Sequence, residues 1–254
     1  MRVLVADAGN SSTTYGVFDG DRLTASFSIQ RQEDGAAAQL SLVQEQLARY
    51  GVSGTEWHGA VVGSVASATD VTAEVVARAT GLPPLIATPT TPGIGVPIAY
   101  ADPAALGIDR LANALAAHEW LADAAIVVDF GTATQFDCVS ADGRFLGGAI
   151  CAGPQLSLDA LSTRSKRLPP LRLQRPVSVL ATETSAALQS GAFFGQAALA
   201  DGMVRRLFVE LKQQCAVIAT GGYCSDIGPE CNSVTHIRPD LTLQGLRLIW
   251  QRCR

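Results

Sequence analysis

The sequence predicts an α/β protein made of two similar domains that face each other across a cleft. Apolar runs of strand length alternate with segments whose apolar residues recur at helical spacing. One series of such elements occurs twice along the chain, which indicates an internal duplication. The 254 residues are 48% hydrophobic, which is enough to bury a substantial core. We therefore expect one domain at residues 1–115 and the other at residues 116–254.

The first copy of the series begins at the N-terminus. It comprises a buried strand, a polar loop, a second strand and a hairpin turn, at residues 3–6, 7–14, 15–18 and 19–20. The turn is expected because Asp-Gly between apolar runs is a typical hairpin connection. Beyond it we expect a helix that stops at Gly51 and a strand that includes Gly63.

The second copy begins at residue 125. It repeats the strand, the loop, the second strand and the turn, at residues 125–128, 129–134, 135–139 and 142–143. A later strand in this copy ends at Gly221, as its counterpart in the first copy ends at Gly63. Helices are expected from Thr184 to Lys212 and from Leu243 to Trp250, the latter amphipathic.

The charge balance and the cysteines exclude several classes of protein. A net charge of −4 gives no long-range attraction to nucleic acid or to an anionic membrane, so we expect neither as a partner. We interpret a basic stretch within residues 164–175 as solvated surface. The six cysteines form no Cys-x-x-Cys pair and the three histidines are scattered, so we expect reduced thiols and no metal beyond Mg²⁺ in catalysis. The first apolar run is too short for a signal peptide or a membrane span, which favours a cytoplasmic protein.

Each copy carries a carboxylate at the end of its first strand, followed by a glycine and several hydroxyl side chains. Asp7 begins one such loop and Asp129 begins the other. Glycine lets the backbone approach a ligand closely, so amide N–H groups and hydroxyls can donate to phosphate oxygens, while the carboxylate can hold Mg²⁺. Either loop alone is more typical of a simple hairpin. Their equivalent positions in a repeat favour a pair of phosphate loops, and residues 220–222 could let a nucleoside lie against the backbone.

The segment between the two copies contains the candidate acceptor site. Asp102 and Pro103 start a short helix, Gly107 ends it, and Asp109 opens a longer helix. By themselves, Asp109 would be a helix cap and Arg110 a solvated charge in the first turn.

The order of motifs along nearly the whole chain resembles that of type III pantothenate kinases, a family in the superfamily of acetate and sugar kinases and actin. The motifs are Asp-x-Gly-Asn-Ser, Tyr followed by Gly-x-Asp-Arg, Asp-x-Gly-Thr-Ala-Thr, Gly-Gly-Ala-Ile and Gln-Ser-Gly, which begin at residues 7, 100, 129, 147 and 189. The resemblance implies two duplicated ribonuclease H-like domains with the actin-like ATPase fold. It also implies phosphorylation of pantothenate with ATP, the first committed step towards coenzyme A.

The resemblance further implies a role for each matching residue. Asp109 would accept the proton of the substrate hydroxyl. The residues around pantothenate would be Tyr100, Gly107, Ile108, Asp109, Arg110 and Thr184. The residues that bind ATP would be Asp7, Ala8, Gly9, Asn10, Ser11, Ser12, Thr13, Thr14 and Thr132. Asp129 would bind a monovalent cation, K⁺ or NH₄⁺, Asp7 is a candidate ligand of the Mg²⁺ that accompanies ATP, and the protein would be a homodimer.

Three positions depart from the family pattern. Gln135 stands where a threonine is usual and Glu183 where an asparagine is usual. Residues 152–154 read Ala-Gly-Pro where Pro-Gly-Leu is expected. Gln135 keeps a hydrogen-bond donor but is bulkier, and Glu183 adds a negative charge close to an anionic substrate.

These residues leave two alternative functions open. One is a kinase of the same superfamily that acts on another small hydroxyl or carboxylate acceptor. The other is a non-catalytic regulatory or accessory homologue. The presence of Asp7, Asp109 and Asp129 favours an enzyme.

Overall fold

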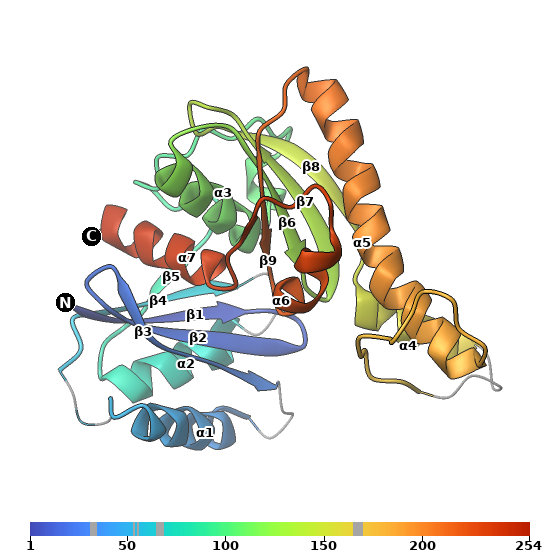
Figure 1. Ribbon diagram of the computed structural model, residues 1–254. Coiled ribbons are helices and arrows are strands. Elements are labelled where there is room, and N and C mark those ends of the chain that lie inside the picture. The colour runs from blue at the N-terminus through green and yellow to red at the C-terminus, as the bar shows by residue number, and fades with distance from the viewer. Residues whose placement is uncertain (31–34, 53, 55, 65–68, 165–169) are drawn as a thin grey trace. The chain divides into compact units, whose positions relative to one another are not determined.

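The computed structural model describes residues 1–254 except 31–34, 53, 55, 65–68 and 165–169. The described chain divides by its internal packing into two compact units, Met1–Ala116 with Leu241–Arg254, and Ala117–Asp240. Each unit contains one five-stranded mixed sheet (Figure 1). The C-terminal helix therefore belongs to the first unit, although it follows the second unit along the chain. The domain limits of 1–115 and 116–254 stay a prediction.

The first unit is built on a sheet with the strand order β3-β2-β1-β4-β5. The strands are β1 (Arg2–Ala8), β2 (Ser12–Asp19), β3 (Arg22–Gln30), β4 (Gly59–Ser64) and β5 (Leu85–Ala87). The first three strands are antiparallel, and β4 and β5 extend the sheet in parallel with β1. Strand β1 is largely buried, which explains its continuous apolar sequence, whereas the edge strand β3 alternates between buried and exposed residues.

Helices cover both faces of this first sheet. Figure 1 shows α1 (Gly35–Arg49) and α2 (Thr69–Thr80) below the strands and α7 (Leu241–Arg252) above them. The lower face buries Leu4, Tyr15 and Val62 with the apolar residues of α1 and α2. The remaining helical elements are the 3₁₀ helix η1 (Pro103–Ala105) and α3 (Ile108–Leu121), which begins in the first unit and ends in the second.

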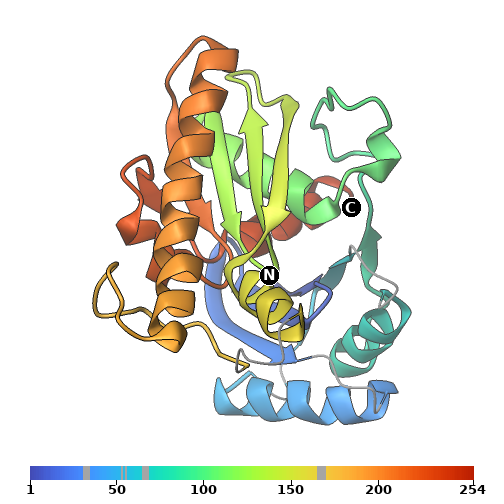
Figure 2. The ribbon, with the colours of Figure 1, turned by 90° about the vertical axis from the view of Figure 1, so that its right-hand side faces the viewer.

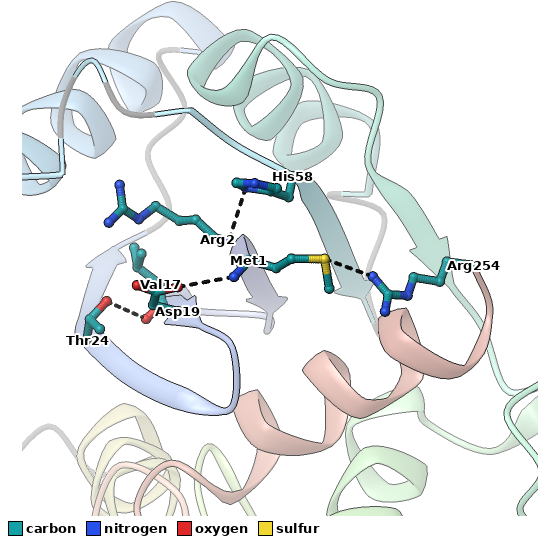
Figure 3. Close-up of polar contacts among 7 residues, drawn as sticks. All are labelled: Met1, Arg2, Val17, Asp19, Thr24, His58 and Arg254. Carbon is teal, nitrogen blue, oxygen red and sulfur yellow. Dashed lines mark hydrogen bonds and ion pairs between the residues drawn. The ribbon is translucent and has the colours of Figure 1, made fainter.

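Polar contacts hold the start of β1, at the end opposite Asp7 (Figure 3). The Met1 ammonium group pairs with Asp19 at 3.2 Å, and the Arg2 amide N–H donates to Nδ1 of His58 at 3.2 Å. The Arg254 guanidinium donates to the Met1 sulfur at 3.2 Å, so the end of the chain is tied to its beginning.

The second unit repeats the topology of the first. Its sheet has the order β10-β9-β6-β7-β8. The strands are β6 (Ala125–Phe130), β7 (Ala133–Val139), β8 (Phe145–Ala152), β9 (Ala216–Thr220) and β10 (His236–Ile237). The antiparallel and parallel pairings match those of the first sheet, and the register irregularity at Val17/Phe18 recurs at Cys138/Val139. The predicted duplication and the α/β fold class are therefore confirmed.

One long helix dominates the second unit. The helical elements are α4 (Pro154–Arg164), α5 (Thr184–Leu211), α6 (Cys224–Ile227) and η2 (Gly228–Glu230). Figure 2 shows α5, in orange, running along one face of the sheet. Its Phe193 and Ala197 belong to the same buried cluster as Ile126 and Phe136 of the strands. In the part of the chain that the structure describes, no helix is both long and apolar enough to cross a membrane.

The predicted polar loops are shorter than expected. Of the two predicted loops, only residues 9–11 and 131–132 lie outside the strands. The other polar residues belong to the strands, where their backbone groups pair with the neighbouring strand. Asp7 pairs with Thr14 and Asp129 pairs with Gln135. The predicted helices and hairpin turns are confirmed, and all six cysteines are free. The basic stretch lies partly outside the described residues, and its Arg175 forms an ion pair with Glu230 at 2.7 Å.

Candidate functional site

The first predicted phosphate loop is a tight connection between β1 and β2. Asp7 lies directly opposite Thr14 in the ladder, so their side chains share one face of the sheet. The Gly9 N–H donates to the Ser12 carbonyl at 3.0 Å and closes the turn, with the side chains of residues 10–11 exposed at its tip. The connection therefore presents a carboxylate and several polar groups together at the strand end.

Thr13 carries a hydroxyl, but its side chain points away from this polar face, as does that of its ladder partner Ala8. Thr13 is buried on the same face of β2 as Tyr15, because alternate residues of a strand share a face. Burial raises the pKa of Tyr15 to about 12, although its hydrogen bond with the Thr13 side chain acts in the opposite direction. Thr13 can thus offer a ligand on the loop only its backbone.

The Gly-x-Asp-Arg segment forms the start of α3, as predicted. The carboxylate of Asp102 accepts the N–H of Ala104 at 3.0 Å and caps η1. The Leu111 N–H donates to the Gly107 carbonyl at 3.2 Å, which begins α3. Asp109 lies in the first turn of this helix, where the helix dipole favours a negative charge.

Ile108 brings the start of α3 beside the first loop. Its buried side chain lies 3.4 Å from the position that a Cβ on Gly63 would occupy. Gly63 is in turn the partner of Asp7 across β1 and β4. The structure therefore brings the Asp7 loop and the Asp109 turn to the same edge of the first sheet, at the carboxyl ends of two parallel strands, where α/β proteins commonly bind ligands.

Arg110 and Tyr100 form a pair close to Asp109. Arg110 is only 4% exposed, its Nη1 donates to the Tyr100 hydroxyl at 3.4 Å, and its guanidinium lies 5.9 Å from the centre of the ring. A guanidinium and a phenol are both suited to hydrogen-bond a ligand that carries a carboxylate and hydroxyl groups.

The second predicted phosphate loop connects β6 and β7 and is packed against the end of β8. The Gly153 N–H donates to the Thr132 carbonyl at 3.0 Å. A Cβ at Gly153 would lie 2.3 Å from the carbonyl oxygen of Gly131 and 2.5 Å from that of Thr132, so only glycine permits this approach. The side chain of Thr132 itself is exposed.

Asp129 lies at the end of β6 among several oxygen atoms. Thr220 is its partner in β9, is fully buried, and has an Oγ1 that finds no hydrogen-bond partner among the described residues. Gly221 follows with φ of 88°, and a Cβ there would lie 2.3 Å from Oδ1 of Asp129 and 2.7 Å from the Phe130 carbonyl oxygen. A carboxylate, a carbonyl and a hydroxyl are hard oxygen donors, so these residues fit a bound cation.

Comparison with known proteins identifies the family. The profile described as Type III pantothenate kinase matches residues 3–206. The type III pantothenate kinase of Moorella thermoacetica is 37% identical over 254 residues, which cover 98% of this chain and 99% of that protein. The chain belongs to the type III pantothenate kinase family.

Solved structures with a similar fold have lower sequence identity to this chain than the type III pantothenate kinase above. A conserved putative Baf family transcriptional activator from Campylobacter jejuni aligns with a TM-score of 0.60 and 20% identity, over 98% of this chain and 97% of that one. An activator of the 2-hydroxyisocaproyl-CoA dehydratase from Clostridium difficile with bound ADPNP aligns with a TM-score of 0.54 and 12% identity, over 98% and 93%. At these identities the likeness shows the fold alone, and with the duplicated sheets it confirms the predicted actin-like ATPase fold.

Two of the departures from the pantothenate kinase pattern take defined places in the second unit. Gln135 lies opposite Asp129 just as Thr14 lies opposite Asp7, so it is the counterpart of that threonine. Glu183 is the N-cap of α5, and its side chain makes no capping hydrogen bond. Thr184 follows it, exposed, in the first turn of the helix.

The third departure, at residues 152–154, surrounds a glycine that the packing requires. Gly153 is the glycine within Ala-Gly-Pro, and glycine occupies the middle place in the usual family pattern as well. Because a Cβ at this place would overlap the carbonyl oxygens of the second loop, the glycine keeps its place while its neighbours differ.

Sequence reasoning missed Gln196, which contacts the second loop region from α5. Its amide accepts the Thr134 hydroxyl hydrogen at 2.8 Å and donates to the Ala152 carbonyl at 2.9 Å. The available signal was a polar residue among the mostly apolar residues that the long helix buries, two turns after Gln189.

Proposed function

We propose that this chain transfers the γ-phosphoryl group of ATP to the primary hydroxyl of pantothenate and so forms 4'-phosphopantothenate, the first step of coenzyme A synthesis. Family membership supports the reaction. The observation that carries the proposed site is the position of Asp109, whose neighbour Ile108 packs at Gly63, the strand partner of Asp7.

Asp109 is the proposed general base. The hydroxyl oxygen of pantothenate attacks the γ-phosphorus, its proton passes to the carboxylate, the bond to the bridging oxygen breaks, and ADP leaves. Phosphoryl transfer depends mainly on positioning and on neutralising charge, so one well-placed carboxylate suffices as the base. The alternative, in which Asp109 only caps the helix, predicts that its ability to accept a proton is dispensable.

The two loops are the proposed phosphate-binding elements. In residues 7–14, the polar side chains on the Asp7 face and the backbone amides at the tip donate to phosphate oxygens, whereas Ala8 and Thr13 contribute through their backbone. The exposed Thr132 hydroxyl is a further proposed donor.

The residues proposed to bind pantothenate lie at the start of α3 and at the start of α5. Arg110, held by Tyr100, hydrogen-bonds the anionic substrate, while Gly107 and Ile108 border it through their backbone. Thr184 contributes its hydroxyl. The adjacent Glu183 is expected to weaken the binding of a carboxylate relative to a neutral residue at that place.

Two kinds of cation fit the carboxylates described above. Asp7, half-buried at a strand end, suits Mg²⁺, which usually takes one or two protein carboxylates together with substrate phosphates. Asp129, with the Phe130 carbonyl and the Thr220 hydroxyl beside it, suits K⁺ or NH₄⁺. Cations bound there would neutralise polyphosphate charge.

We further propose that the protein is a cytoplasmic homodimer. The family resemblance motivates both statements. Light scattering at micromolar concentration should give twice the mass of the 26.5 kDa chain. A fully active monomer would rule the dimer out.

A coupled assay of ADP release tests the function directly. Pantothenate, glucose and acetate are supplied separately as acceptors, with ATP and Mg²⁺ present. We expect ADP release when pantothenate is the acceptor, and none when glucose or acetate is. Turnover with glucose or acetate instead would identify a different kinase, and nucleotide binding without turnover on any acceptor would identify a non-catalytic homologue.

A further inference from the structure

Helix α5 carries two glutamines that hold backbone segments beside it. Gln189 and Gln196 are seven residues apart, which is about two helical turns, so they share one face of the helix. Each uses both the oxygen and the nitrogen of its side-chain amide. A glutamine amide can in this way replace the donor and acceptor that a neighbouring strand would supply.

Gln196 holds the base of the second phosphate loop. It is 6% exposed and bridges Thr134 of β7 and Ala152 of β8, at 2.8 Å and 2.9 Å. The residue after Ala152 is Gly153, whose N–H donates to the Thr132 carbonyl at 3.0 Å. The amide of Gln196 is therefore connected to the loop through β7, which follows the loop, and through the end of β8, which packs against it.

Gln189 holds a segment without regular secondary structure that leads towards Thr184. Its Nε2 donates to the Arg172 carbonyl at 2.6 Å, and its Oε1 accepts the Gln174 N–H at 2.9 Å. The segment, residues 171–180, thus runs beside α5 with its backbone bonded to a side chain of the helix.

Other side chains of the second unit hold the same segment. The Gln155 amide donates to the Leu171 carbonyl and accepts the Leu173 N–H, both at 2.8 Å. The Ser190 hydroxyl donates to the Val179 carbonyl at 2.6 Å, and Arg175 forms an ion pair with Glu230 at 2.7 Å. Backbone groups that no sheet or helix pairs are therefore satisfied by side chains, which fixes the path of the chain into the start of α5.

We propose that Gln189 and Gln196 are positioning residues that fix the two substrate-binding segments to one helix. Gln196 positions the ATP side, through the loop at residues 131–132. Gln189 positions the pantothenate side, through the segment before Thr184. The identity of the two substrates rests on the proposed function. Since each glutamine holds a different segment, each should affect mainly one substrate.

The substitution Gln196→Met tests the ATP side. Methionine keeps the volume but removes both hydrogen bonds, so the loop loses its anchor. We expect the KM for ATP to rise by about tenfold, with the KM for pantothenate changed by less than about twofold. Adding Thr134→Val removes the buried hydroxyl that Gln196→Met leaves unpaired, so it should restore the unfolding temperature but not the KM for ATP.

The substitution Gln189→Leu tests the pantothenate side. We expect the opposite pattern, a KM for pantothenate raised by about tenfold at saturating ATP and a nearly unchanged KM for ATP. Amide hydrogen exchange should become faster across residues 171–180. Gln213→Ala is the matched control, since this glutamine is exposed beyond the end of α5 and should leave both KM values unchanged.

Several results would overturn the proposal. One is an unchanged KM for ATP in Gln196→Met despite a lower unfolding temperature, which would leave Gln196 a packing residue. Another is an equal change of both KM values in both variants. If Gln196→Met does not fold, Gln196→Glu retains the volume and the acceptor for Thr134 and should show a smaller rise in the same KM.

A separate measurement distinguishes this proposal from the proposed function. If the wild-type protein does not phosphorylate pantothenate, the proposed function fails. Calorimetric binding of a non-hydrolysable ATP analogue still tests Gln196, with affinity expected to be about tenfold weaker in Gln196→Met. Equal affinity in the two proteins would overturn the role of Gln196 whatever the acceptor is.

Discussion

Three aspartates show how neighbours decide what a carboxylate does in this chain. Asp102 accepts a backbone N–H and caps η1. Asp109 lies in the first turn of the next helix and follows Ile108, which packs at the edge that also holds Asp7. Asp129 ends a strand beside a buried hydroxyl and a glycine that leaves room for oxygen atoms. The same side chain is therefore a cap, a proposed base and a proposed cation ligand.

We predict that Asp109→Asn nearly abolishes turnover while the protein stays folded. The amide is almost isosteric but cannot accept the proton, and loss of a general base typically lowers kcat by about 10² to 10⁴. The coupled assay gives kcat, and thermal unfolding monitors the fold. Asp102→Asn is the matched control, because asparagine can still accept the Ala104 N–H and the residue lies outside the proposed site. A near-wild-type kcat in Asp109→Asn would show that Asp109 is only part of the helix start.

We predict that activity rises with K⁺ or NH₄⁺ and much less with Na⁺. The oxygens around Asp129 suit a monovalent cation, whose charge would offset repulsion between phosphates. Rates are compared in Tris buffer without monovalent metals and with each chloride at matched ionic strength. Gly221→Ala should reduce the difference between salts, since its Cβ would overlap Oδ1 of Asp129 and its φ is 88°. Equal rates in all salts and in none would leave Asp129 as a magnesium or structural residue.

Helix α7 joins the first sheet to the start of α3. The Thr242 hydroxyl donates to Oδ1 of Asn113 at 2.8 Å, and both side chains are buried. Gly245 lies so close to α3 that a Cβ there would be 2.0 Å from the Ala112 carbonyl oxygen. Because α3 carries Asp109, the last helix of the chain supports the element on which the proposed base stands.

We predict that Gly245→Ala destabilises the protein by about 1–3 kcal/mol, since the new methyl group must displace backbone rather than a flexible side chain. Chemical denaturation measures the loss. Gly202→Ala is the control within α5, where a Cβ meets nothing within 4 Å, so it should stabilise by about 0.5–1 kcal/mol through helix propensity. Equal effects of the two substitutions would contradict the close approach of α7 and α3.

Across the whole molecule, buried weak acids set the behaviour at high pH. Burial raises the pKa of Cys224 to about 11 and those of Cys231 and Tyr15 to about 12. These groups ionise more easily in the unfolded chain than in the folded one. Their stabilising contribution is therefore complete below the unfolded pKa values, near 9 to 10, and is lost as the pH rises towards 12.

We predict that the free energy of unfolding falls between pH 9 and about pH 11. Urea unfolding at several pH values in this range, under reducing conditions, measures the slope. The double variant Cys224→Ala and Cys231→Ala lowers stability at neutral pH by creating small cavities, but its stability should fall less steeply above pH 9. An identical slope in the two proteins would mean that other groups control the alkaline transition.

Local patterns in the sequence were enough for the repeat, the succession of elements along each copy and the candidate residues. Asp7 and Asp129 could be paired as equivalents because each follows a buried apolar strand and precedes a hairpin, and these features depend only on residues nearby in the chain. The family motifs supplied Asp109 and its neighbours. The polar loops were predicted too long, because polar side chains do not prevent backbone groups from pairing across a ladder.

Only the tertiary structure decided which distant residues meet. Thr220 beside Asp129, Gly153 against the loop at Thr132, and Gln196 between β7 and β8 all involve partners far apart in the sequence. Strand register and the position of a long helix against a sheet set these contacts, and neither leaves a local signal in the chain. The sequence by itself determined the kind of chemistry that this family performs, whereas the packing of distant elements determined which side chains lie beside the candidate site residues.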